Sequence, residues 1–103
     1  MKTFIAISLF LSISLFQLSA QTISLEDINT EAYLSMMDAD NLLEEEKPAE
    51  ALGYYQKSLK AYESLREQDP GFKKQIVDYR IDLLQEKIAS LQERVPNALP
   101  PEA

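Results

Sequence analysis

The chain has 103 residues, ten basic and seventeen acidic side chains, a formal net charge of −7, and no His, Cys or Trp. These absences remove the commonest metal ligands, thiol and imidazole catalysis, and disulfides, so we expect a protein that is not an enzyme and holds no cofactor or metal. Nine of the acids lie between residues 21 and 50, against Lys47 alone. Without a basic stripe to neutralise phosphates, nucleic acid is not an expected partner.

Residues 1–20 have the pattern of an export signal. Lys2 supplies a positive start, the run from Phe4 to Phe16 is almost wholly apolar, and the segment ends in Ser19 and Ala20. This apolar run of about thirteen residues is shorter than the roughly 20 that cross a bilayer as a helix. We therefore expect an exported protein of the periplasm or extracellular space. The alternative is an uncleaved, membrane-anchored first segment, and only then is a membrane a partner.

The signal pattern leads to a prediction about processing. We expect cleavage after Ala20, because a small residue at that place suits signal cleavage, so that the exported chain begins at Gln21. Intact-mass measurement of exported protein checks this. A mass that still includes residues 1–20 would instead indicate a membrane anchor.

A lead-in segment over 21–29 precedes the first predicted helix. Two helix-capping signals follow each other, one at Ser24 and one at Thr30, and we place the main start at Thr30. The helical pattern runs to Glu46. Its apolar positions are Leu34, Met37 and Leu42, with Ala39 between them.

The second predicted helix runs from Pro48 to about Gln68. Proline suits the first turn of a helix because its missing N–H would have no intrahelical partner. The segment Asp69 to Gly71 ends the helix by turn chemistry. The apolar positions, which step by three and four, are Ala51, Leu52, Tyr55, Leu59, Tyr62 and Leu65.

The third predicted helix begins near Phe72 and carries two apolar rows. The first row is confined to the N-terminal half and consists of Ile76, Tyr79 and Leu83. The second row, spaced like a coiled-coil seam, consists of Val77, Ile81, Leu84, Ile88, Leu91 and Val95. We expect the N-terminal half to pack against both other helices and the C-terminal half against one neighbour or another chain. The candidate interface is Ile81, Leu84, Ile88, Leu91 and Val95.

The predicted fold is all-α, a three-helix antiparallel bundle over residues 30–95 with a Pro-rich C-terminal tail at 96–103. Four tyrosines on these helices would form either a recognition surface or half-buried helix contacts. They are Tyr33, Tyr54, Tyr62 and Tyr79.

The segment Glu50-Ala51-Leu52 followed by Tyr55, after an acidic helix and a Lys-Pro turn, resembles the second half of a tetratricopeptide repeat (TPR). In that family a small residue and an aromatic four positions later fill the gap between two helices, which implies packing roles for Ala51 and Tyr55. The family's spacing places Ala39 and Leu42 at the matching positions of the first helix. The resemblance covers residues 31–70, and the second predicted helix is about two turns longer than in the family.

The chain looks closest to single-repeat secreted proteins of bacteria, in which a Pro-containing turn and a third helix with a Tyr-Arg-Ile stretch follow the hairpin. The resemblance implies a TPR-like hairpin plus a long third helix, and a non-catalytic protein–protein interaction module of the bacterial envelope. The expected partner is a protein or peptide. The alternative is a structural homodimer formed through the third helix.

Overall fold

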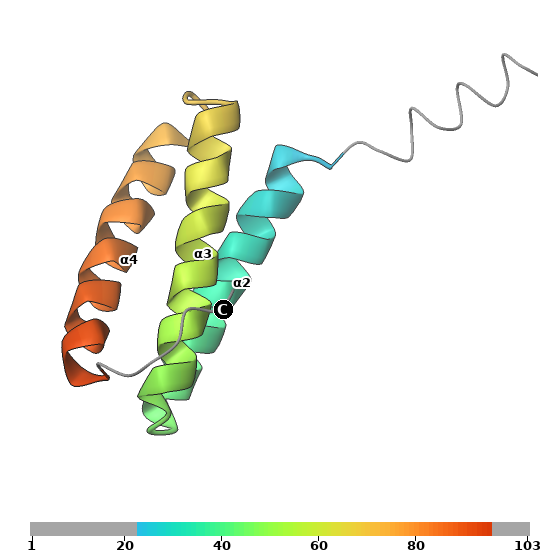
Figure 1. Cartoon of the computed structure of the whole chain (residues 1–103). Coiled ribbons are helices and arrows are strands. Elements are labelled where there is room, and N and C mark those ends of the chain that lie inside the picture. The colour runs from blue at the N-terminus through green and yellow to red at the C-terminus, as the bar shows by residue number, and fades with distance from the viewer. Residues whose placement is uncertain (1–22, 96–103) are drawn as a thin grey trace, which may run out of the picture.

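The computed structural model describes residues 23–95, which form three helices and no strand. They are α2 (Leu25–Glu44), α3 (Pro48–Gln68) and α4 (Lys74–Arg94). The chain reverses direction at each of the two turns, so α2 and α4 are parallel and α3 is antiparallel to both (Figure 1). The all-α three-helix fold is thus confirmed. The predicted export signal and the Pro-rich tail lie outside the described residues.

The first helix starts earlier than Thr30. Ser24 is the N-cap, and its Oγ accepts a hydrogen bond from the Asp27 amide at 3.1 Å. Leu25 and Ile28 then pack against the core. The expected lead-in is therefore helical from Leu25, because the first capping signal is reinforced by burial of the turn that follows it.

The turn between α2 and α3 closes the hairpin with backbone hydrogen bonds. The Lys47 amide donates to the Leu42 carbonyl at 2.9 Å, and the Glu46 amide donates to the Leu43 carbonyl at 3.0 Å. Glu46 adopts the left-handed conformation, with φ of 62°, that this type of helix end requires. Pro48 follows as the first residue of α3, as predicted.

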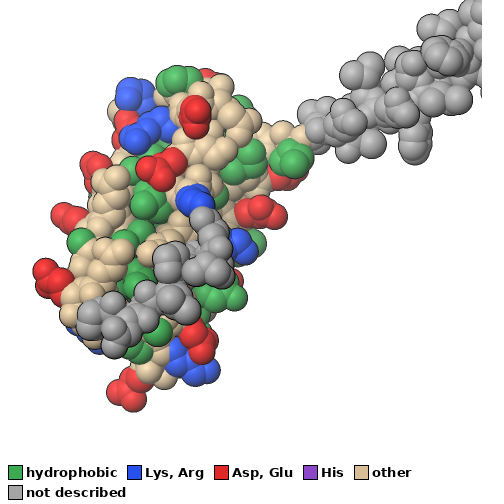
Figure 2. Space-filling model, in the orientation of Figure 1, with side chains coloured by type: hydrophobic (Ala, Val, Ile, Leu, Met, Phe, Trp, Pro, Cys, Tyr) green, Lys and Arg blue, Asp and Glu red, His purple; other side chains and the backbone are tan. Residues whose placement is uncertain are grey.

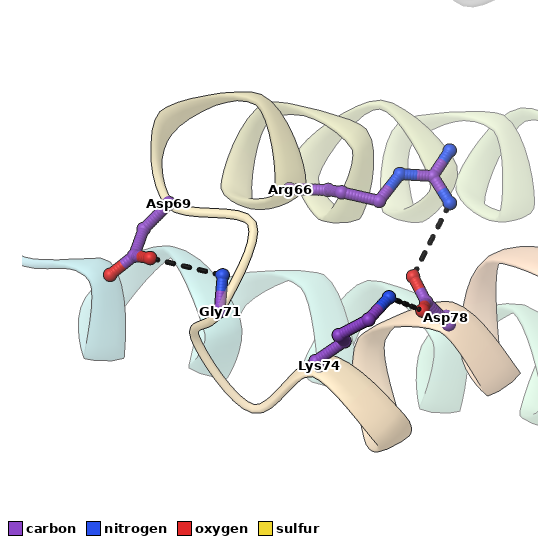
Figure 3. Close-up of polar contacts among 5 residues, drawn as sticks. All are labelled: Arg66, Asp69, Gly71, Lys74 and Asp78. Atoms are coloured by element: carbon purple, nitrogen blue, oxygen red, sulfur yellow. Dashed lines mark hydrogen bonds and ion pairs between the residues drawn. The ribbon is translucent and has the colours of Figure 1, made fainter.

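The turn between α3 and α4 is held by side chains (Figure 3). Asp69 Oδ1 accepts from the Gly71 amide at 3.1 Å. Asp78 on α4 accepts from Lys74 at 2.7 Å and contacts Arg66 of α3 at 3.4 Å. The helix begins at Lys74, just after the predicted start near Phe72, since the Phe72 amide donates to the Asp69 carbonyl within the turn.

The core lies on both sides of α3, which packs against α2 and against α4. No Cα atom of α4 lies within 8 Å of one in α2. The expectation that the N-terminal half of α4 packs against both other helices is therefore wrong: Ile76 is 46% exposed and Tyr79 is 66% exposed. The hydrophobic core consists of Ala32, Met36, Ala39, Ala51, Leu52, Tyr55, Tyr62, Leu65, Val77, Ile81, Leu84, Ile88 and Leu91.

Gly53 lies within α3, where a Cβ atom would have no other atom within 4 Å. Its φ is not positive, so alanine fits the backbone as it stands. We expect Gly53→Ala to raise the free energy of unfolding by about 0.5–1 kcal/mol, because alanine has less conformational freedom to lose on folding. Urea unfolding followed by far-UV circular dichroism measures this, and a loss of stability would contradict it.

Candidate functional site

The four residues assigned to hairpin packing lie between α2 and α3. Ala39, Ala51 and Tyr55 have no exposed surface, and Leu42 is half-buried against the core. Tyr55 is buried while its neighbour Tyr54 is 39% exposed. These side chains pack the hairpin together, and the three fully buried ones offer no surface to a ligand.

The candidate interface row of α4 is also internal. Ile81, Leu84, Ile88 and Leu91 are buried, between 0% and 8% exposed, and Val95 is half-buried. The row is covered because α4 lies along α3. Of the two partners expected for its C-terminal half, one neighbouring helix or another chain, the structure shows the neighbouring helix α3. Contact between copies through this row would require α4 to leave α3.

Side chains, and not backbone packing, connect α4 to α2. Three cations take part: Arg80 and Lys87 on α4, and Lys73 at its N-cap. They are spaced by seven residues, and so are their three partners on α2. Because seven residues make two helical turns, each set lies along one line of its helix. The partners are Glu26, Tyr33 and Asp40. We call these six residues the cation ladder.

The outer rungs of the cation ladder are ion pairs and the central rung is a cation–π contact. Lys73 Nζ lies 3.6 Å from Glu26 Oε2, and Lys87 Nζ lies 3.6 Å from Asp40 Oδ1. The Arg80 guanidinium carbon lies 4.8 Å from the centre of the Tyr33 ring. Parallel helices keep equal spacings in register, which is why all three rungs form.

Two buried tyrosines of α3, also seven residues apart, lie beneath the cation ladder. Arg80 Nη1 donates to the Tyr62 hydroxyl at 2.8 Å. The Tyr55 hydroxyl donates to Asp40, and Lys87 Nζ lies 5.4 Å from the Tyr55 ring. Sequence reasoning missed this network, although the matching seven-residue spacings were a usable signal.

Burial raises the pKa of Tyr55 well above its ordinary value, and its hydrogen bond to the negative Asp40 raises it further. Burial also raises the pKa of Tyr62, although Arg80 opposes the shift. Because the pKa of each tyrosine is higher in the folded chain, the unfolded chain loses the tyrosine proton at a lower pH. The free energy of unfolding therefore has its full value below the unfolded pKa and falls as the pH rises above it.

We therefore expect the free energy of unfolding to decline above about pH 10, the ordinary tyrosine pKa. Tyr55→Phe removes one of the two responsible hydroxyls, so its stability should decline less steeply. Urea titrations at a series of alkaline pH values compare the two slopes. Equal slopes would contradict the role assigned to Tyr55.

An exposed apolar face borders the cation ladder on the side away from α3. Around α2, the positions that pack on α3 are followed by those of the cation ladder, and these are followed by the outward-facing Leu34 and Met37. Around α4, the same order ends in Ile76 and Tyr79. These side chains are 54%, 38%, 46% and 66% exposed. With Tyr33, which is 39% exposed, they form what we call the apolar face. Figure 2 shows one face of the molecule, on which acidic and basic side chains are mixed around hydrophobic ones.

Comparison with protein-family models, with curated proteins and with solved structures finds no match to this chain. Within residues 23–95, no helix is long and apolar enough to cross a membrane. In the same part of the chain, no group of three or more His, Cys, Asp or Glu side chains is placed to hold a metal ion.

Proposed function

We propose that this protein is an exported, non-catalytic protein-binding module of the bacterial envelope, and that it binds its partner through the apolar face. The observation that carries the proposal is that the outward positions beside the cation ladder hold large, exposed apolar side chains on both helices, Leu34 and Met37 on α2 and Ile76 and Tyr79 on α4. Contiguous apolar patches on a small protein usually mark an interaction site. Tyr33 and Tyr79 suit such a site, because tyrosine offers apolar area and a polar tip.

The other parts of the proposal rest on the sequence. The pattern of residues 1–20 supports export, and Ala51 with Tyr55, buried between the two helices of the hairpin, supports a TPR-like relationship. That resemblance in turn supports binding of a protein or peptide, with no chemical step. A single hairpin with one further helix presents a short surface, so we expect the partner to contribute a single segment.

Site-specific photo-cross-linking in the native host tests the proposal. A benzophenone analogue of phenylalanine replaces Tyr79 on the apolar face or, as the matched control, Tyr54 on the outer surface of α3. Both tyrosines are exposed on helices, so either replacement leaves the core intact. We expect a discrete protein adduct from position 79 and none from position 54.

The mass of the adduct identifies the kind of partner, and an adduct of twice the chain's own mass would identify a second copy. Absence of any adduct from both Tyr79 and Leu34 positions would contradict binding through the apolar face. Equal adducts from positions 79 and 54 would show non-specific contact, and would contradict it too.

A further inference from the structure

The charges around the apolar face indicate what kind of segment it accepts. On α2, Glu31 and Asp38 flank Leu34 and are exposed. On α4, Asp82 and Glu86 are exposed beyond Tyr79. Within residues 23–95 none of these four carboxylates has an ion-pair partner. The apolar face is therefore bordered by free negative charge on both sides.

The nearest cations offset only part of this charge, since Arg80 alone among them lacks a carboxylate partner within residues 23–95. Lys73 and Lys87 are paired with Glu26 and Asp40, and Arg80 is held between two tyrosine rings. Helix α2 contains no Lys or Arg at all. An incoming acidic segment would thus meet unpaired carboxylates at both borders, whereas a basic one would find partners for its side chains there.

We propose that the segment bound at the apolar face is a basic amphipathic helix, with Lys or Arg on both sides of an apolar stripe. This inference rests on the proposed function and names the partner's chemistry. A helix fits because its apolar stripe would lie on Leu34, Met37 and Ile76 while its flanking cations reach the acidic borders. An anionic lipid surface is disfavoured, since the same carboxylates would repel it.

Three labelled model peptides of about four helical turns test the proposal. They share one leucine stripe and differ only in the flanking residues, which are Lys, Gln or Glu. Fluorescence anisotropy with the purified exported protein measures each affinity at low and at physiological salt. We expect the Lys peptide to bind at least about tenfold more tightly than the Gln peptide, the Glu peptide not to bind, and the difference to shrink with salt.

Two double variants with the same change in net charge separate local from overall attraction. The first, Glu31→Gln with Asp38→Asn, removes one acidic border and should weaken Lys-peptide binding about threefold or more. The control, Glu63→Gln with Glu67→Gln on α3, should leave binding unchanged. Leu34→Ser removes apolar contact without altering charge and should weaken binding of both the Lys and the Gln peptide.

Each contrary outcome has a distinct meaning. Equal binding of the Lys and Gln peptides overturns the basic partner but leaves binding at the apolar face intact. Equal weakening by both double variants indicates attraction by net charge alone, which also overturns it. Binding of neutral phosphatidylcholine vesicles in place of peptide would indicate a lipid partner. Peptide binding unaffected by Leu34→Ser, together with no cross-link at position 79, overturns the proposed function as well.

Discussion

Tyr55→Ala is expected to lower the free energy of unfolding by about 3–5 kcal/mol, whereas Tyr54→Ala should cost less than about 1 kcal/mol. Tyr55 has no exposed surface and lies in the core, so truncation leaves a cavity in addition to the lost apolar burial. It also removes the hydroxyl that donates to Asp40. Tyr54, by contrast, is 39% exposed, and water can take the place of its ring.

Denaturant unfolding of both variants gives the comparison directly. Tyr55→Phe serves as an intermediate control, because it keeps the ring and should lose only about 0.5–1.5 kcal/mol with the hydrogen bond. Equal losses from Tyr54→Ala and Tyr55→Ala would mean that the opposite face of α3 forms the core. Loss of stability from Tyr55→Phe as large as that from Tyr55→Ala would assign the effect to the hydroxyl.

Ile88→Asp and Leu91→Asp are expected to destabilise the fold by more than about 3 kcal/mol each, without any change in oligomeric state before unfolding. Both positions are buried against α3, Ile88 at 8% and Leu91 at 3% exposure. An aspartate there loses hydration, and the core offers it no cation. The marginal stability of a domain this small makes such a loss comparable with the whole free energy of unfolding.

Sedimentation across a concentration series, with far-UV circular dichroism alongside, checks this expectation. Tyr79→Asp is the matched control on the exposed row of the same helix, and it should stay folded. A wild-type dimer that Ile88→Asp converts into a folded monomer would contradict burial of this row within the chain. Full helicity in Leu91→Asp would show that the end of α4 does not pack on α3.

The features that depend on neighbouring residues could be predicted from the amino-acid sequence alone. Pro48 and the segment from Asp69 to Gly71 set both ends of α3, because proline and turn chemistry act within a few residues whatever surrounds them. The spacing of apolar positions likewise distinguished buried Tyr55 from exposed Tyr54, since helical geometry alone decides which side chains share a face.

Which partner covers each helix face depends on how the three helices are arranged in space. The apolar row of α4 has the same sequence pattern whether α3 or a second chain covers it. Likewise, the capping signals at Ser24 and Thr30 are similar in sequence, so the sequence does not show which of them starts the helix. The cation ladder depends on α2 and α4 running parallel in one register, which brings together residues far apart in the chain. Local patterns show which side chains each helix presents, but the packing of α2 and of α4 on α3 determines which side chains they contact.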